Sequence, residues 1–196
     1  FVGIESPDTD SLVLMQKKQN TRRSLQQSIE TIHKAGIFVN AGFIVGFDSE
    51  KGSVAQGMID CIEDTSIPIC MVGLLYALPT TQLTRRLLAE GRLFSGSEQT
   101  QSGDQCTAGL NFETKRPRRD VLNDYRTVLT AIYTPTAYFG RVRRLGRMLK
   151  RKRVHRRIKG DLRSFVRLMF RIHHVGPGTG RQFWRMLLDC ALHNPR

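Results

Sequence analysis

Blocks of apolar and polar residues alternate along the first 91 residues, and each block predicts one element of secondary structure. Short apolar runs at 1–5, 37–45 and 69–76 predict strands, and the last of these carries no charge, as in a strand buried on both faces. Apolar residues at helical spacing predict helices at about 10–18, 21–35, 53–64 and 83–91. Strands that alternate with helices predict a parallel sheet with right-handed crossovers, so the expected fold class is α/β.

The pattern changes after Gly91. Residues 92–116 are polar and rich in glycine, which predicts a long loop or linker. Beyond Pro117 apolar residues follow a helical period almost to the end, with helices expected at about 117–132, from Pro135, at 161–173 and at 180–193. We therefore expect three parts, an α/β part at 1–91, a linker at 92–116 and a basic helical part at 117–196.

Positive charge is concentrated in the last quarter of the chain. Residues 1–140 have a net charge of −1, whereas residues 141–196 have a net charge of +15, and the densest cationic stretch is 141–153. This stretch is interpreted as a solvated helix face, a contact with an anionic membrane surface, or a nucleic-acid site. Nucleic acid is disfavoured because the aromatic residues of this region, such as Phe165 and Trp184, fall at helical core spacing and do not interleave with the basic residues.

Several common site types are disfavoured by the sequence. The four cysteines show no C-x2-C or C-x3-C spacing, so no local zinc or iron–sulfur motif is present. The stretch 176–180 (Gly-Pro-Gly-Thr-Gly) has no preceding strand and no following Lys-Ser/Thr, so an interhelix turn is favoured over a phosphate loop. No apolar run is long enough to cross a bilayer and no secretory signal is evident. We expect a cytoplasmic protein, with peripheral membrane association as the alternative.

The stretch Gly42–Asp48 (Gly-Phe-Ile-Val-Gly-Phe-Asp) combines a buried strand with two glycines at alternate positions. Alternate positions on a strand face the same side, so we expect Gly42 and Gly46 to share one face with Ile44. One interpretation is a core strand with a bulge. The other is that this face lies against a flat ligand such as an adenine ring.

The order of three segments resembles a known family. These are Phe-Val-Gly-Ile-Glu-Ser at 1–6, the stretch at 42–48 and Gly-Leu-Leu-Tyr-Ala-Leu-Pro at 73–79. Together they resemble the second half of the radical S-adenosylmethionine barrel, in particular the cobalamin-binding group with a DUF4070 C-terminal extension. Landmarks similar to those of that extension are Asn111-Phe112, Tyr133-Thr134-Pro135, Tyr138-Phe139 and Gln182-Phe183-Trp184.

The resemblance implies a partial, half radical-SAM TIM-like barrel with parallel strands, followed by an all-helical extension. It implies S-adenosylmethionine as cofactor, with Gly42, Ile44 and Gly46 against the adenine. The family's motif Gly-x-Ile-x-Gly-x-x-Glu places Ser49 where an acid is expected, with acids on either side of it. Which acid replaces the expected one stays open.

Two further cofactor contacts are implied by the same resemblance. Glu5 lies where the family places an acid or amide near the cofactor ribose, and a turn residue or helix cap is the equal alternative. Lys17 lies where the family often keeps a base for the methionyl carboxylate. A solvated pair with Lys18 is the favoured alternative for that position.

The family's three cluster cysteines, spaced C-x3-C-x2-C, do not occur in these 196 residues. The [4Fe-4S] cluster and cobalamin are therefore expected in the full-length family only, and this chain alone is expected to be inactive. We interpret it as a fragment of a radical methyltransferase or related enzyme. Its expected partners are a small-molecule or lipid-like substrate and the missing N-terminal half. The alternative function is a non-catalytic basic helical module that binds an anionic membrane surface or nucleic acid.

Overall fold

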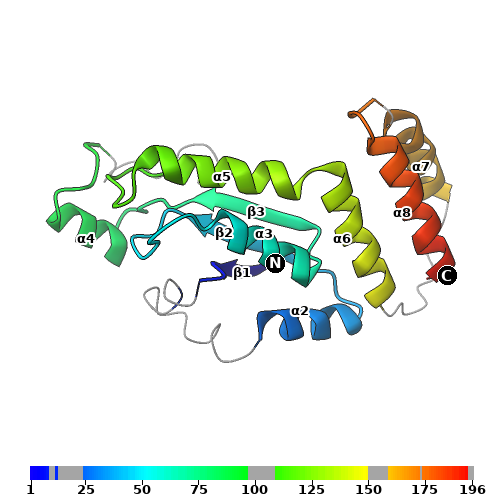
Figure 1. The fold of residues 1–196 in the computed structure, drawn as a ribbon, viewed down its shortest axis with the longest axis horizontal. Helices are drawn as coiled ribbons and strands as arrows, with labels where there is room; N and C mark the ends of the chain where they lie inside the picture. Colours follow the sequence, from blue (N-terminus) through cyan, green and yellow to red (C-terminus); the bar gives the residue numbers. More distant parts are fainter. Residues whose placement is uncertain (9–11, 13–23, 97–108, 150–158, 173, 194–196) are drawn as a thin grey trace.

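A computed structural model describes residues 1–8, 12, 24–96, 109–149, 159–172 and 174–193. Its centre is a three-stranded parallel sheet with strand order β1-β2-β3, formed by β1 (Val2–Glu5), β2 (Asn40–Val45) and β3 (Ile69–Leu74). Helix α2 (Leu25–Lys34) lies between β1 and β2 in the chain, and α3 (Ala55–Thr65) connects β2 to β3 (Figure 1). The prediction of an α/β fold with three parallel strands is confirmed.

Local signals set the ends of the first helices. The hydroxyl of Ser24 accepts a hydrogen bond from the Gln27 N–H and so caps α2. The predicted start of this helix, at residue 21, lies outside the described residues. Gly36 follows α2 with φ +85°, the left-handed conformation that ends many helices and favours glycine. Helix α4 (Gln82–Ala89) begins at the Thr81 cap. The predicted helix at 10–18 lies outside the described residues except for Leu12.

The second half of the chain contributes four helices to the described structure. Helix α5 (Arg118–Ile132) runs along the sheet, and α6 (Pro135–Met148) turns away from it after the Thr134 cap (Figure 1). Helix α8 (Thr179–His193) packs on α6, and α7 (Lys159–Ile172) lies beside α8. The predicted helices of this region are therefore confirmed, with small shifts at their ends.

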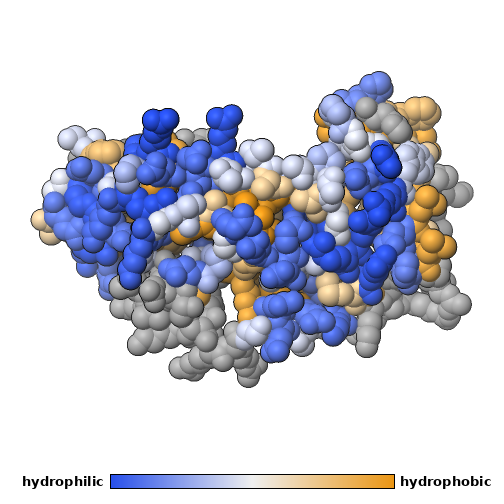
Figure 2. Space-filling model, viewed as in Figure 1, coloured by the Kyte–Doolittle hydropathy of each residue, from blue (hydrophilic) through white to orange (hydrophobic). Residues whose placement is uncertain are grey.

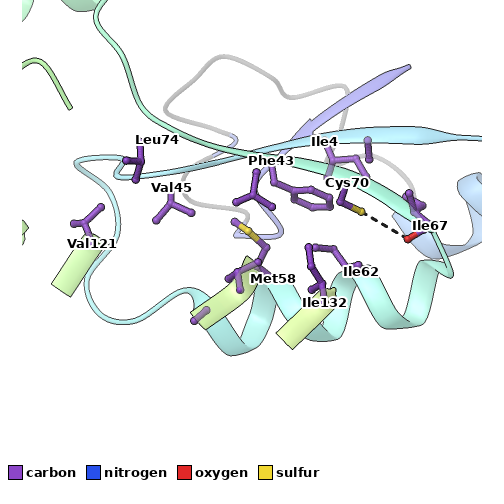
Figure 3. Packing of buried hydrophobic residues seen from close by; sticks show 14 of the residues in the cluster. Ile4, Phe43, Val45, Met58, Ile62, Ile67, Cys70, Leu74, Val121 and Ile132 are labelled. Carbon is purple, nitrogen blue, oxygen red and sulfur yellow. Dashed lines mark hydrogen bonds between the residues drawn. The ribbon is translucent and has the colours of Figure 1, made fainter. Parts of the chain in front are cut away.

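The hydrophobic core lies between one face of the sheet and the helices α3 and α5. Figure 3 shows Phe43 and Val45 of β2 pointing toward Met58 and Ile62 of α3. Burying each such side chain contributes about 1.5–3 kcal/mol. Other buried side chains on this face come from all three strands and from α5: Ile4, Ala41, Cys70, Val72, Leu74, Val121, Val128 and Ile132.

The other face of the sheet is open, which corrects one prediction. The uncharged run at 69–76 was expected to be buried on both faces, but Ile69 and Met71 are exposed, Met71 by 56%. Side chains alternate across a strand, and the helices of the described part cover only the face that carries Cys70 and Val72. In the described part of the chain, the sheet is therefore exposed at Ile69 and Met71 opposite its core, while Gly73 farther along the same face is buried.

Candidate functional site

The open face of the sheet carries a row of small and apolar residues from all three strands. Gly3 of β1 is paired with Gly42 of β2, and Gly42 with Met71 of β3, so the three lie side by side. Ile44 of β2 and Gly73 of β3 form the next pair. Two adjacent glycines leave a shallow flat area that side chains would otherwise fill.

An aromatic ring already lies on this flat area. A Cβ atom added to Gly42 would come within 2.9 Å of Cζ of Phe1, so the ring of Phe1 packs directly against the glycine. Phe1 is 77% exposed, and the ring atoms nearest to this added Cβ are Cζ and the two Cε atoms, at the outer edge of the ring. Gly42 thus leaves room for the edge of the Phe1 ring, and another ring at the same position requires the Phe1 side chain to rotate away.

Gly46 does not share this face, contrary to the expectation from its spacing. Strand β2 ends at Val45, and Gly46 has φ +107°, which favours glycine and turns the chain. A Cβ atom there would come within 2.8 Å of Leu110, on the core side. Gly46 therefore permits a turn and close packing, while Gly42 and Ile44 alone occupy the open face of β2.

Glu50 holds the turn that follows β2. One carboxylate oxygen accepts hydrogen bonds from the N–H groups of Gly46 (2.8 Å) and Phe47 (3.0 Å). The other accepts one from Arg116 at 2.9 Å. Burial raises the pKa of Glu50, and these three hydrogen bonds partly offset that effect. Of the two acids that flank Ser49, Glu50 is therefore the one that fixes the backbone after the glycine motif.

Asp48 has different partners. Arg92 donates two hydrogen bonds to its carboxylate at 2.7 and 2.9 Å, and Arg86 of α4 donates a third at 2.8 Å. Burial acts to raise the pKa of Asp48, but the hydrogen bonds and charges of these arginines outweigh it and lower the pKa. Asp48 thus joins the turn to α4 and the segment after it.

A hollow of about 330 Å³ lies at the carboxyl ends of β1 and β2. It is lined by Pro7 and Asp8 after β1 and by residues 49–54 and Gly57 around the start of α3. Glu5, the last residue of β1, stands next to this segment with φ +70° and is half-buried. Ligands of α/β proteins gather at the carboxyl ends of parallel strands, so Glu5 is in a suitable place for such a contact. Lys17 lies outside the described residues.

Arg116 and Asp124 complete the site's framework and were not anticipated from the sequence. Asp124 accepts hydrogen bonds from the Ser53 hydroxyl (2.6 Å), the Val54 N–H (3.1 Å) and Arg116 (2.8 Å). This carboxylate of α5 therefore caps the start of α3. Its signal in the sequence is an acid at a core position of an amphipathic helix, three residues after Val121.

The cationic stretch 141–153 is described up to residue 149, and its arginines there differ in burial. Arg141 is fully buried; it donates to the carbonyl groups of Ile67 (2.9 Å) and Ile132 (2.6 Å) and pairs with Glu63. Arg144 also pairs with Glu63 at 2.7 Å, and Arg147 pairs with Asp189 of α8. The interpretation of this part as a solvated helix face is therefore wrong for Arg141, whereas Arg144 and Arg147 are exposed and pair with acids of α3 and α8.

The described cysteines show no sign of metal chemistry. Burial raises the pKa of the Cys61 thiol to about 11 and that of Cys70 to about 12, so both are protonated at neutral pH. In the described ranges no group of three or more His, Cys, Asp or Glu side chains could hold a metal ion. Cys106 lies outside those ranges. No helix of the described part is long and apolar enough to span a membrane.

A second hollow, of about 500 Å³, lies where the α5–α6 corner meets the α7–α8 turn. Its lining has no charged side chain: Tyr133, Pro135, Tyr138, Phe139, Ile172, Val175, Gly176, Pro177 and Thr179. The Tyr133 hydroxyl donates to the Cys70 carbonyl (2.6 Å) and accepts from the Cys70 N–H (3.2 Å). Tyr133 therefore also satisfies the backbone of the edge strand β3.

Comparisons with known proteins identify relatives in two bacteria. The chain is 35% identical over 199 residues to an uncharacterized methyltransferase of Synechocystis sp., covering all of this chain and 36% of that protein. It is 31% identical over 141 residues to the hopanoid C-2 methylase of Rhodopseudomonas palustris, covering 72% of this chain and 25% of that protein. The chain thus spans about a third or less of the length of these curated relatives. Comparison with solved structures finds no match.

A family model also matches the second part of the chain. The model of the domain of unknown function DUF4070 covers residues 81–196, from the cap of α4 through α8. The match includes the whole of α5, α6, α7 and α8 but none of the three strands. The chain therefore belongs to the DUF4070 family.

Proposed function

We propose that the chain is the C-terminal part of a B12-dependent radical S-adenosylmethionine methylase, and that the open sheet face forms the adenine and ribose side of the cofactor site. The observation that carries the proposal is the pairing of Gly3 and Gly42 on an uncovered face, against which the Phe1 ring packs. The names of the two relatives, a methyltransferase and a hopanoid C-2 methylase, support the reaction class.

In this proposal each residue of the open face has a separate role. Gly42 lets the purine ring lie flat on β2, and Ile44 and Met71 contact the ring from the same face. Glu5 accepts hydrogen bonds from the ribose hydroxyls, and Lys17 pairs with the methionyl carboxylate.

Gly46 acts through the shape of the turn. Its N–H is held by Glu50, which is in turn held by Arg116. The network fixes the end of β2 and the first residues of the 330 Å³ hollow, so the strand face does not shift when a ring binds. Glu50 and Arg116 are positioning residues in this account.

The residues of this chain fit the nucleoside but do not fit the iron–sulfur cluster of the family. An aromatic ring already lies with its edge against Gly42, whereas these 196 residues have no C-x3-C-x2-C triplet for a cluster. When bound, S-adenosylmethionine supplies the methyl group and the source of the radical. The residues of this chain would bind and orient it, and cluster and cobalamin ligands would come from a preceding part of the enzyme.

The substrate in this proposal is a small, largely apolar molecule of lipid type. The relative named for hopanoid methylation supports that class. The half barrel that the family resemblance implies would be completed by the same preceding part, pairing along β1 or covering the open face. The chain by itself is expected to bind nucleosides weakly and to catalyse no methylation.

Methyl and amide NMR with 5′-deoxyadenosine tests the proposal without any cluster. The expected result is a saturable shift of the Ile44 and Met71 methyl signals and of the Gly42 amide. In Gly42→Val the affinity should fall about tenfold or more, because the branched side chain fills the flat area. The matched control is Gly57→Val, since a Cβ atom at Gly57 meets nothing within 4 Å. Shifts confined to the hollow at residues 49–57, or equal affinity in both variants, would contradict the proposal.

A further inference from the structure

The α7–α8 hairpin exposes large apolar side chains along its whole length. Phe170 of α7 is 75% exposed, and Leu192 of α8 is 79% exposed. The others are Val166, Leu168, Val175 and Leu188. Figure 2 shows hydrophobic surface on the outer side of this hairpin. So many exposed apolar side chains on one pair of helices indicate a surface that binds an apolar partner.

The same hairpin carries exposed arginines that have no partner within the described structure. These are Arg163, Arg167 and Arg171, one helical turn apart on α7, and Arg181 and Arg185 on α8. The acid of α8, Asp189, already pairs with Arg147 of α6. Six further cations precede α7 in the sequence, among residues 150–157: Lys150, Arg151, Lys152, Arg153, Arg156 and Arg157. The hairpin thus combines exposed apolar groups with an excess of positive charge.

Tyrosines stand at one end of this surface. The uncharged hollow at the α7–α8 turn is bordered by Tyr133 and Tyr138 and by Val175 of the turn. Tyrosine has an apolar ring and a polar hydroxyl, which suits the boundary between hydrocarbon and water. Apolar, aromatic and cationic groups therefore occur together at the turn.

We propose that the α7–α8 hairpin docks on the surface of an anionic lipid bilayer. The exposed apolar side chains enter the boundary between headgroups and acyl chains, and the arginines bind lipid phosphates. Helices that bind in this way lie in the plane of the membrane and do not cross it. The inference is independent of the cofactor proposal, because it concerns residues far along the chain from the strand glycines.

The positive charge of the hairpin favours an anionic bilayer over a second copy of the chain as its partner. Two copies that met through this hairpin would bring arginine against arginine, which repels. An anionic surface removes that cost and accepts the apolar side chains as well. A nucleic acid would satisfy the arginines but would leave Phe170, Leu188 and Leu192 in water.

Sedimentation with vesicles tests the proposal on the full 196-residue chain. Vesicles of phosphatidylcholine with about 30 mol % phosphatidylglycerol should bind the chain at least tenfold more tightly than pure phosphatidylcholine, because each arginine gains attraction from the anionic surface. Arg181→Gln with Arg185→Gln should weaken that binding about tenfold. Phe170→Ser with Leu192→Ser should weaken it to a similar extent even at low salt, because insertion is lost.

Matched controls use exposed residues outside the hairpin. Arg126→Gln on α5 and Leu88→Ser on α4 should leave vesicle binding unchanged, since both are exposed away from α7 and α8. Circular dichroism of every variant checks that the helices remain. Equal losses in hairpin and control variants would overturn the proposal.

Two further outcomes would also overturn it. One is binding to duplex DNA that is as tight as binding to anionic vesicles and that Phe170→Ser with Leu192→Ser leaves intact. The other is dimerisation in light scattering that the same pair of substitutions abolishes, without vesicle binding by the unchanged chain. Either result would assign the hairpin to a different partner.

Discussion

Two groups of arginines in the helical half of the chain have opposite surroundings. Arg141, Arg144 and Arg147 of α6 are joined to Glu63 and Asp189, and Arg141 is fully buried. The arginines of α7 and α8 are exposed beside apolar side chains. Helices α6, α7 and α8 are all rich in arginine, so their composition does not distinguish them. The role of each arginine depends on whether an acid or a carbonyl group binds it. Those of α6 hold the fold together, and those of the hairpin are available to a ligand surface.

Removing Arg141 should have the largest effect on stability. Arg141→Ala removes the donor that the carbonyl groups of Ile67 and Ile132 share, and it leaves the Glu63 carboxylate with Arg144 as its remaining partner. Breaking a buried ion pair in this way costs about 3–5 kcal/mol. Urea denaturation measures this loss of unfolding free energy. The comparison variant is Arg167→Ala on α7, and similar midpoints for the two variants would break the distinction between α6 and the hairpin.

Removing Asp124 should have the next largest effect. Asp124→Asn keeps the shape of the side chain but weakens its hydrogen bonds with Ser53, Val54 and Arg116, at a cost of about 1–3 kcal/mol. Burial opposes the charge of Asp124, but its hydrogen bonds and Arg116 outweigh that and lower its pKa.

The lowered pKa of Asp124 also predicts how the stability of the chain depends on pH. The pKa of Asp124 is lower in the folded than in the unfolded chain. Its contribution to the free energy of unfolding is therefore present above its ordinary pKa, and it is lost as the pH falls through the pKa of the folded state. The unfolding free energy of the unchanged chain should therefore fall between about pH 5 and pH 2, and Asp124→Asn should flatten that fall. Parallel curves for the two proteins would show that Asp124 is not the group responsible.

A smaller loss is expected at the edge of the sheet. Tyr133→Phe removes the hydroxyl that bonds both backbone groups of Cys70, which should cost about 1 kcal/mol. Hydrogen exchange at Cys70 should accelerate, because the edge strand loses its partner. Tyr138→Phe serves as the control. An unchanged exchange rate at Cys70 would mean that the two hydrogen bonds add nothing in solution.

The smallest effect on stability is expected in the hairpin. Arg167→Gln and Leu192→Ser should each change the unfolding free energy by no more than about 0.5 kcal/mol, as exposed substitutions usually do. The same substitutions are expected to reduce vesicle binding. Thermal denaturation that shows a clear loss for Leu192→Ser would place this side chain in the core of the helical part and make the comparison invalid.

The sequence was sufficient for the order and type of most elements. Strong periodicity predicted a helix ending at about residue 35, where α2 ends, and a helix from Pro135, where α6 begins. The sequence was not sufficient to predict which face of a strand or helix is buried. The uncharged composition of β3 indicated burial on both faces, but on the side opposite Cys70 and Val72 its residues Ile69 and Met71 are exposed. Burial of a face depends on elements far along the chain.

The site could be predicted only in part for a similar reason. Gly42 and Ile44 occupy the open face as their spacing implies, but Gly46 turns toward Leu110 because the strand ends one residue earlier. The choice of Glu50 over Asp48 as the anchor of the turn depends on Arg116, which lies 66 residues away. The burial of Arg141 likewise depends on Glu63 and Ile67 of another helix and its end. Such pairings are tertiary and leave little local signal.

The most direct measurement of the cofactor assignment is a crystal structure of the chain grown with 5′-deoxyadenosine. Our account predicts the purine ring flat on Gly42, between Ile44 and Met71, with the Phe1 side chain rotated away from the sheet. A structure in which Phe1 stays on Gly42 while the nucleoside lies elsewhere would contradict it.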